Sequence, residues 1–492
     1  MTTVARAAGN RILRGIEAVW APVKRINGWQ ILLALAIGWY VWNFTHTSLR
    51  IHHGLGTSAY DFGLYDQGTW LLSRFKAPFV TLMGRNLFGD HASLIMVLVV
   101  PFYWLAPSPG TLFFLQSAAL GAAAIPVYLL ARRRLGYEPL AVVLAVAFLC
   151  HPSLSGTNLE GFHPDAFLPL FVGFAIYFAI RARWAPYFVF VVLALMVKED
   201  AALVIVPLGI WAAFRRDRFV GAITVSLGAF FALLGMTLLE VLSGRAVPNA
   251  WRIPFGGVVG FLGALVSRPL DVFDHLTADG RPWYLWQMTL PYLWLFLLSP
   301  GVAAIGVVVL ASNTISTFGY QHQIWFHYSV VILPALALAA VCGIARLRAR
   351  FHAAAAIVVL IVSVSAGYAW GRFPFGRDPG AYWSPSFVVA AEARELLPLV
   401  PSDAVVSAHH AITTHLAHRE MVYMFPNPIS TVLYGDFDSV LDEGRRLPVA
   451  SEVEFVFLRR VMEPAEEKLW LSEVDDFEVY AENEYWVLWR RR

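Results

Sequence analysis

The amino-acid sequence is poor in charge and in cysteine, and each shortage excludes a class of protein. Charged residues make up 14% of the 492 positions, whereas soluble domains carry roughly a quarter. The two cysteines, Cys150 and Cys342, lie in apolar runs, which excludes a disulfide framework and a cysteine-based metal site. The net charge of +3 gives no basis for nucleic-acid binding. With 58% hydrophobic residues and a mean hydropathy of +0.59, the chain is predicted to be a polytopic α-helical membrane protein.

Short basic clusters between the apolar runs predict how the spans are oriented. Cytoplasmic loops are enriched in Lys and Arg, so the basic segment 1–28 is placed in the cytoplasm. The Arg132–Arg134 cluster is placed there too, which makes 94–106, already broken by Pro101, a helix at the outer interface. Continuing the alternation through residues 29–370 predicts about eleven spans in a bacterial plasma membrane. The predicted spans are 29–48, 111–131, 139–152, 166–180, 185–197, 201–214, 219–242, 286–298, 301–312, 325–345 and 353–370.

The composition changes at Gly371 to that of a soluble domain. Residues 371–492 are predicted to form a small α/β domain outside the membrane, with about 120 residues, which is within the usual domain range. The hydrophobic pattern predicts an amphipathic helix over 388–397 and a short helix over 411–417. Strands are expected at 404–408, 421–425 and 454–458, with a terminal hairpin around 477–488.

Acidic residues and histidines gather at the predicted outer ends of the spans. Because ionisable groups near lipid are costly, such a cluster is a functional-site hypothesis. The long outer loop 49–110 holds Asp61 and Asp66, which are flanked by Tyr60 and Gln67. A carboxylate beside a membrane cavity can act as a general base or coordinate a divalent cation; the alternative is a helix cap or a solvated loop acid. Asp61 is the favoured base because it lies nearer to the first span.

Further polar groups follow on the same predicted side. Glu160 and His163 have a Glu-x-x-His spacing, which places both side chains on one face of a helix, although Pro164 interrupts the segment. The three charges from Lys198 to Asp200 need partners or a water-filled cavity, and Lys198 suits a lipid phosphate. Interfacial capping, mutual ion pairing and aromatic anchoring are the structural alternatives. The candidate substrate-binding residues are Tyr60, Gln67, His91, Glu160, His163, Lys198, Glu199, Asp200, Arg252, His322 and His327. The candidate ligands of a divalent cation, Mg²⁺ or Mn²⁺, are Asp66, His91 and His163.

These motifs, taken in order, resemble an uncharacterised family of predicted bacterial and archaeal membrane proteins, known as domain of unknown function 2079. The resemblance covers most of the chain. The residues that carry it are Asp61-x-Gly63-x-x-Asp66-Gln67, Asp90-His91, Pro107-x-Pro109-x-Thr111-Leu112, Gln116, Arg132 to Gly136, Phe162-His163, Lys198 to Asp200, and Pro401 to Ala408. That family in turn resembles the GT-C glycosyltransferases in its layout, with a first span, a long acidic outer loop, interfacial helices and an Arg-terminated second span.

The resemblance implies a catalytic carboxylate in the first outer loop, which maps onto Asp61 or Asp66. It also implies a polyprenyl-phosphate-linked sugar donor that enters from membrane lipid, and a glycan, lipid or protein acceptor in the cell envelope. The chain departs from the GT-C pattern because its first outer loop lacks an adjacent Asp-Glu pair and has Asp61-x-x-x-x-Asp66 instead. The rival hypothesis is a non-catalytic membrane protein, such as a lipid-linked-sugar carrier or an envelope-assembly scaffold. A polar pocket at one membrane face would favour transfer, and a midplane site would favour transport.

Overall fold

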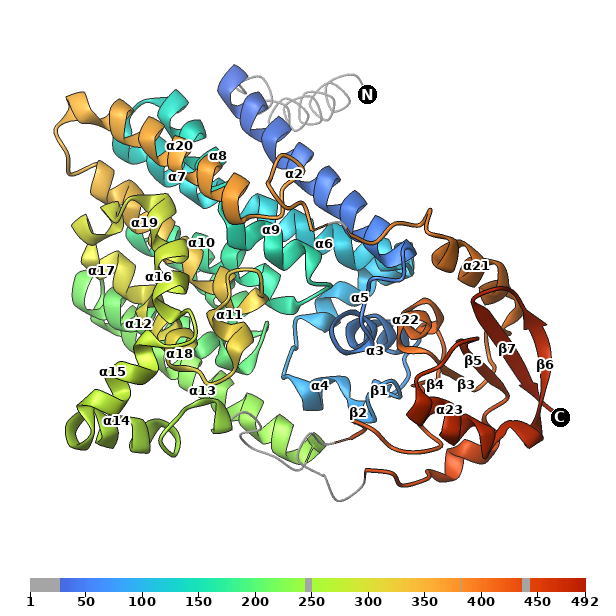
Figure 1. Ribbon diagram of the computed structural model, residues 1–492. Helices are drawn as coiled ribbons and strands as arrows, with labels where there is room; N and C mark the ends of the chain where they lie inside the picture. Colours follow the sequence, from blue (N-terminus) through green and yellow to red (C-terminus); the bar gives the residue numbers. More distant parts are fainter. Residues whose placement is uncertain (1–26, 244–249, 381, 436–442) are drawn as a thin grey trace, which may run out of the picture.

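The computed structural model is mostly helical and ends in a small β-sheet region (Figure 1). It describes residues 27–243, 250–380, 382–435 and 443–492. The predicted cytoplasmic segment 1–28 lies almost wholly outside the described residues. The first long helix, α2 (Gly28–His53), begins at an Asn27 cap whose side chain accepts hydrogen bonds from the backbone N–H groups of Trp29 and Gln30. This capping box satisfies backbone donors that would otherwise lack partners.

The helical region continues with elements whose ends are set by proline and glycine. Pro109, Pro152 and Pro164 each stand at the start of a helix, where a missing N–H costs nothing. Gly136 ends a helix in the left-handed conformation, with φ of 66°. The helices are α3 (Leu64–Ser73), α4 (Leu87–Asp90), α5 (Met96–Leu105), α6 (Pro109–Ala122), α7 (Ala124–Leu135), α8 (Glu138–Leu149), α9 (Pro152–Leu159), α10 (Leu168–Ile180), α11 (Trp184–Leu195), α12 (Ala202–Arg215), α13 (Arg218–Ser243), α14 (Gly257–Ser267), α15 (Pro269–Thr277), α16 (Arg281–Thr289), α17 (Pro300–Ala303), α18 (Val307–Ile315), α19 (Leu333–Ile344) and α20 (His352–Trp370).

Four helical stretches of the described chain are long and apolar enough to cross a membrane. They are Pro109–Leu135, Arg218–Ser243, His327–Ile344 and Ala349–Trp370. The α8–α9 pair, bent by 46°, adds a fifth if it forms one broken span. Shorter apolar helices include α5, α11 and the stretches Pro164–Ile180 and Pro300–Ile315. The chain is therefore a multi-pass membrane protein, while the count of about eleven spans and the sidedness of the termini stay predictions.

Several helices run between two polar pockets and so place them at opposite ends of the bundle. Helix α12 follows Lys198, which lines one pocket, and ends at Arg215, which lines the other. Helix α10 joins Asp165 of the first pocket to Ile180 of the second. An α-helix rises about 1.5 Å per residue, so the fourteen residues of α12 separate the pockets by roughly 20 Å. Arg134, Arg215, Arg216 and Arg346 meet in the second pocket, as expected for one basic face.

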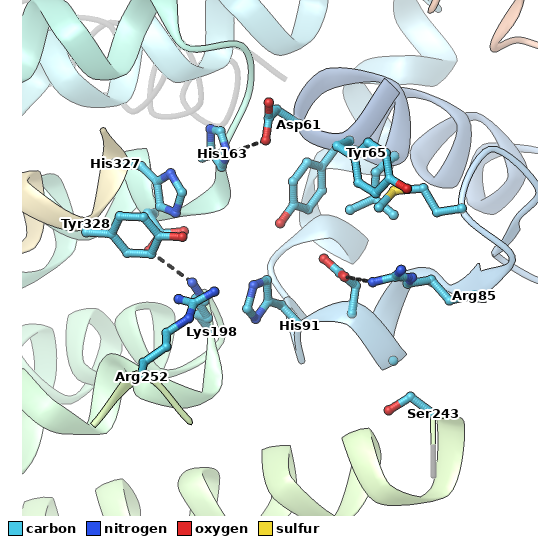
Figure 2. A pocket seen from close by; sticks show the side chains of 16 residues that line it. Asp61, Tyr65, Arg85, His91, His163, Lys198, Ser243, Arg252, His327 and Tyr328 are labelled. Carbon is cyan, nitrogen blue, oxygen red and sulfur yellow. Dashed lines mark hydrogen bonds and ion pairs between the residues drawn. The ribbon is translucent and has the colours of Figure 1, made fainter. Parts of the chain in front are cut away.

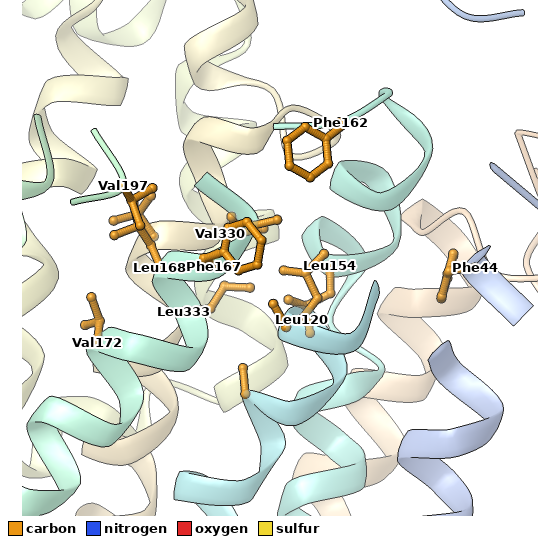
Figure 3. Packing of buried hydrophobic residues seen from close by; sticks show 14 of the residues in the cluster. Phe44, Leu120, Leu154, Phe162, Phe167, Leu168, Val172, Val197, Val330 and Leu333 are labelled. Carbon is orange, nitrogen blue, oxygen red and sulfur yellow. The ribbon is translucent and has the colours of Figure 1, made fainter. Parts of the chain in front are cut away.

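One apolar core fills the space between these helices. Leu120, Leu154, Phe162, Leu168 and Leu333 are fully buried and come from separate segments of the chain (Figure 3). Such burial of apolar area against neighbouring helices holds the bundle at crystal-like packing density. The loop that carries the polar residues is thereby held on a rigid support.

The C-terminal region contains a five-stranded sheet with the order β4-β3-β5-β7-β6. Strand β3 is parallel to β4 and β5, whereas β7 is antiparallel to β5 and β6. Each predicted strand and the predicted helix over 388–397 correspond to an element of the structure. Helix α23 was not predicted from the sequence. The domain boundary at 370/371 stays a prediction. The elements are α21 (Val388–Leu396), β3 (Val406–Ala408), α22 (His410–Thr413), β4 (Val422–Met424), β5 (Phe455–Arg459), α23 (Pro464–Leu471), β6 (Phe477–Glu482) and β7 (Trp486–Arg491).

The long loop between α2 and α5 packs against the edge of this sheet (Figure 1). The loop contains a small hairpin of β1 (Phe79–Val80) and β2 (Arg85–Asn86). Thr81 at its turn donates a hydrogen bond of 2.8 Å to the carbonyl of Val422 in β4. The Gln67 amide donates to the Thr81 hydroxyl at 2.9 Å and to the Arg419 carbonyl at 3.2 Å. The sheet therefore fixes the loop that positions the candidate site.

Candidate active site

A polar pocket opens where the long loop between α2 and α5 meets the helical bundle (Figure 2). It holds about 870 Å³ of space that no atom fills, part of which is open to solvent. Side chains from the α2–α5 loop, the α9–α10 turn, the α11–α12 turn and the start of η10 (His327–Ile332) converge on it. The lining residues are Tyr60, Asp61, Leu64, Tyr65, Met83, Arg85, Gly89, Asp90, His91, His163, Asp165, Lys198, Ser243, Arg252, His327 and Tyr328.

Asp61 and His163 form the acid–base pair of this pocket. The His163 Nε2 atom lies 3.7 Å from Asp61 Oδ1 (Figure 2). Burial raises the pKa of Asp61, but its interaction with the neighbouring His163 ring outweighs burial and lowers that pKa below its usual value. The Asp61 carboxylate is therefore ionised at neutral pH. The side chain of Asp61 is 45% exposed, so a second molecule in the pocket can reach the carboxylate.

Glu160 lies next to His163 and His327, just outside the pocket lining. Its carboxylate accepts hydrogen bonds from the His327 backbone N–H at 2.7 Å and from His327 Nδ1 at 3.1 Å. The His163 and His327 rings stack with their centroids 3.9 Å apart. Burial raises the pKa of Glu160 to about 8. Gly161 has a φ of 121°, which allows the turn between Glu160 and His163. A β-carbon at this position would lie 3.5 Å from the β-carbon of Asp61, so Gly161 faces Asp61.

Two cationic side chains lie across the pocket from Asp61. Lys198 is buried, with Nζ 3.7 Å from Asp165 and 3.8 Å from Asp200. Burial lowers the pKa of Lys198, but the charges of Asp165 and Asp200 outweigh burial and raise it well above its usual value. Arg252 stacks on Phe318, with its guanidinium 4.3 Å from the ring centre. Within the described residues no carboxylate pairs with Arg252, and its buried Nε has no hydrogen-bond partner. Arg252 is thus open to an anionic ligand.

The floor of the pocket is fixed by two ion pairs. Arg85 donates to Asp90 at 2.8 Å, and His91 Nδ1 lies 2.9 Å from Glu199. Burial raises the pKa of Glu199, but His91 and Lys198 outweigh it and lower the pKa to about 2. Glu199 also accepts the backbone N–H of Ala92 at 3.0 Å, which ties α4 and α5 to the α11–α12 turn.

Seven of the thirteen candidate catalytic and substrate-binding residues line the pocket: Tyr60, Asp61, His91, His163, Lys198, Arg252 and His327. Glu160, Glu199 and Asp200 do not line it, but each pairs with a lining side chain. The other three, Asp66, Gln67 and His322, lie elsewhere. Asp66 is 1% exposed and its Oδ1 accepts from Tyr103 at 2.5 Å and from His418 at 3.0 Å, so it faces the C-terminal sheet region instead. Gln67 braces Thr81, as described above. His322 is buried but does not line the pocket. The structure also does not unite the expected metal ligands: Asp66 and His91 have other partners, and only His163 belongs to a group of potential ligands.

Other polar residues of the pocket were not among the candidates from the sequence, and three of them bear on its chemistry. Arg85 and Tyr328 lie in the pocket wall, and Asp165 is the nearest carboxylate to Lys198. Asp165 lies two residues after His163 and so carried a positional signal. Arg85 lies in an otherwise apolar stretch five residues before Asp90, which also marks it as a candidate partner. Tyr328 offered no signal beyond its place next to His327.

An apolar groove lies beside the polar pocket on the helical surface. It is lined by residues of α5, α6, α10 and α11, and almost all of its lining surface is apolar. Ile95 in its wall is four residues from His91, and Phe167 is two residues from Asp165. The groove residues are Ile95, Leu98, Val99, Phe102, Leu115, Ala118, Ala119, Ala122, Phe167, Leu170, Phe171 and Leu193. An exposed apolar groove on such a surface suits a lipid chain.

The family of the chain follows from its sequence over most of its length. The model of a family of predicted membrane proteins, DUF2079, matches residues 51–480. The chain belongs to this family. No curated protein is similar enough in sequence to match.

Solved structures show the same fold. ArnT from Cupriavidus metallidurans bound to undecaprenyl phosphate has a TM-score of 0.54 and 15% identity, with 94% of this chain and 98% of ArnT covered. The apo state of that protein gives a TM-score of 0.56 and 14% identity over 94% and 97% of the two chains. The DUF2079 chain therefore shares the fold of ArnT over most of its length. At this identity the likeness concerns the fold.

Proposed function

We propose that this DUF2079 protein is a membrane glycosyltransferase that moves a sugar from a polyprenyl-phosphate donor to an acceptor in the cell envelope. The observation that carries the proposal is the pairing of an exposed carboxylate with two cationic side chains in one pocket, beside an apolar groove. A lipid-linked sugar has the matching chemistry, with an apolar chain, an anionic phosphate and a reactive anomeric carbon. ArnT, which has the same fold, was crystallised with undecaprenyl phosphate.

Asp61 is the proposed general base. Its carboxylate takes the proton of the acceptor hydroxyl while the acceptor oxygen forms a bond to the anomeric carbon. The bond from that carbon to the phosphate oxygen breaks, and polyprenyl phosphate leaves with the electron pair, so the configuration inverts. Of the two aspartates suggested by sequence, only Asp61 faces the pocket; Asp66 is buried against Tyr103 and His418.

Lys198 and Arg252 are the proposed phosphate ligands. Charge develops on the departing phosphate oxygen, and fixed cations at that position lower the barrier. Lys198 stays protonated because of its two carboxylate neighbours, while Arg252 is open to an anion among the described residues. The groove between α5 and α10 would hold the first part of the polyprenyl chain.

The rival function is a non-catalytic carrier or scaffold. The pocket lies at the ends of α10 and α12 rather than midway along them, which does not favour a midplane transport site. A single-face pocket with a half-exposed carboxylate suits transfer better.

The test uses purified full-length protein in lipid vesicles that contain radiolabelled polyprenyl-phosphate sugars from bacterial membranes. Wild-type protein with an envelope extract should release free polyprenyl phosphate, and Asp61→Asn should reduce the rate by about a hundredfold or more. Asp475→Asn, an exposed aspartate outside the pocket, is the control and should keep the wild-type rate. Equal rates in Asp61→Asn and wild type would remove Asp61 as the base, and donor that crosses the bilayer unchanged would favour a carrier.

A further inference from the structure

We infer that Glu160, His163 and His327 form a binding site for one zinc ion in the wall of the pocket. Each residue offers one ligand atom, and these atoms all lie within 4.8 Å of one another. Among the described residues this is the one group of three such side chains. All three residues are candidates for substrate binding from the sequence, and His163 is also a predicted ligand of a divalent cation, there together with Asp66 and His91.

The distances are near those of a bound ion. Zinc takes nitrogen and oxygen ligands at about 2.0–2.2 Å in tetrahedral sites, which sets its ligands roughly 3.3 Å apart. His327 Nδ1 and Glu160 Oε1 are 3.1 Å apart, so this pair already has that spacing. His163 Nδ1 and Glu160 Oε2 are 3.9 Å apart. The rings of His163 and His327 stack 3.9 Å apart, so an ion between the ligand atoms requires these rings to turn toward it.

A buried nitrogen without a partner points into the same space. His163 is 6% exposed, and its Nδ1 has no hydrogen-bond partner. A buried polar atom of this kind is costly, and its partner in a native protein is commonly a water or an ion. Nδ1 faces the Glu160 carboxylate at a distance too long for a hydrogen bond. An ion between the two atoms would satisfy both.

Asp61 completes the arrangement on the other side of the ring. The second nitrogen of His163, Nε2, lies 3.7 Å from Asp61 Oδ1. A histidine that binds a metal usually donates its other N–H to a carboxylate, which fixes the tautomer and the ring orientation. With the proton on Nε2, the Nδ1 lone pair of His163 is free for the ion. Asp61 is thus a positioning residue for the zinc site, besides its proposed role toward the acceptor.

The donor set selects the kind of ion. Two imidazoles and one carboxylate suit zinc, whereas Mg²⁺ and Mn²⁺, the ions expected from sequence, prefer oxygen ligands. Three protein ligands leave a fourth position for water or a substrate oxygen. His163 and His327 both line the pocket, so that position opens toward Lys198 and Arg252.

The experiment measures zinc binding by the full-length protein in detergent, without any donor or acceptor. Protein stripped with a chelator is titrated with Zn²⁺ against a fluorescent competitor. Wild type should bind one zinc per chain, and His163→Gln and His327→Gln should each weaken binding by more than about tenfold. His322→Gln, a buried histidine outside the group, should bind zinc as wild type does.

The outcomes separate this inference from the transferase proposal. Failure of wild type to bind zinc near one equivalent, or equal affinity in wild type and both ligand variants, would overturn the zinc site. If the variants do not give a single species on size exclusion, the visible absorption of Co²⁺-loaded wild type decides. Bands of four-coordinate cobalt with nitrogen and oxygen ligands support the site, and their absence rejects it. Transfer of sugar is measured separately, so either proposal can fail alone.

Discussion

Replacing Lys198 by Met leaves a buried negative charge without its cation, and the structure gives the magnitude of the effect. The side chains of Lys198 and Asp165 are 4% and 5% exposed, with 3.7 Å between Nζ and Oδ1. At this distance and an effective dielectric constant of about 20, their attraction is about 4 kcal/mol. Removing one partner of a buried pair costs about 3–5 kcal/mol because the other charge stays desolvated. We therefore expect Lys198→Met to lower the free energy of unfolding by about 3 kcal/mol or more.

The assay is SDS-induced unfolding in mixed micelles, followed by far-UV circular dichroism. The second variant, Asp165→Asn with Lys198→Met, removes both charges of this pair and should recover most of the lost stability, because Asp165 no longer carries an unpaired buried charge. The control is Lys76→Met. Lys76 also pairs with a carboxylate, Glu420, but the two side chains are 41% and 59% exposed, and such pairs contribute about 1 kcal/mol or less.

Two results would refute this reasoning. If Lys198→Met costs no more than Lys76→Met, the Lys198–Asp165 pair is solvated in the protein and the pocket is wetter than its burial indicates. If the double variant is as unstable as the single one, the loss arises from packing of the lysine chain against Tyr328 rather than from the unpaired charge.

Three further predictions follow from other contacts. Gly156→Ala should lower stability by about 1–3 kcal/mol, because its methyl group would lie 2.5 Å from the Trp325 backbone; an unchanged unfolding midpoint would contradict this packing. Burial lowers the pKa of His418, but the neighbouring Asp66 carboxylate outweighs burial and raises that pKa in the folded protein. The His418–Asp66 pair therefore stabilises the fold at pH values below the pKa of His418 in the unfolded chain. This stabilisation is lost as the pH rises through the pKa of His418 in the folded protein. His418→Gln should therefore cost more stability at pH 5.5 than at pH 8.5, and an equal cost at both values would exclude the linkage. Arg252→Met should raise the KM for a polyprenyl-phosphate donor by about tenfold or more, with Arg252→Lys intermediate; donor titrations that superimpose on wild type would remove Arg252 from the phosphate site.

The sequence was a good guide to the elements and to where polar residues gather. Apolar runs ending in basic clusters marked many of the helices, and short apolar runs marked the strands of the C-terminal sheet. The costly placement of charges near lipid directed attention to Asp61, His163 and Lys198, which meet in one pocket. These signals are local, since they depend on residue type and on spacing along the chain.

The choice between residues of the same type could not be made from the chain. Asp61 and Asp66 are five positions apart with similar neighbours, yet one faces the pocket and the other faces His418. Asp61 lies in a π-helical turn over Ala59–Gly63, and Asp66 lies in the first turn of α3, which follows directly. That geometry depends on contacts with the C-terminal sheet, more than 300 residues away in sequence, which no local pattern encodes.

The sequence by itself thus determined that the protein lies in a membrane and that its ionisable residues gather at the ends of its helices, because hydropathy and charge act residue by residue. Only the tertiary structure decided which of them are neighbours. It brought Glu160 to His327 across 167 positions, and it turned Asp66 and Gln67 away from the pocket to brace the loop. Contacts of that range arise when distant segments pack around one core, and the spacing of residues along a chain does not record them.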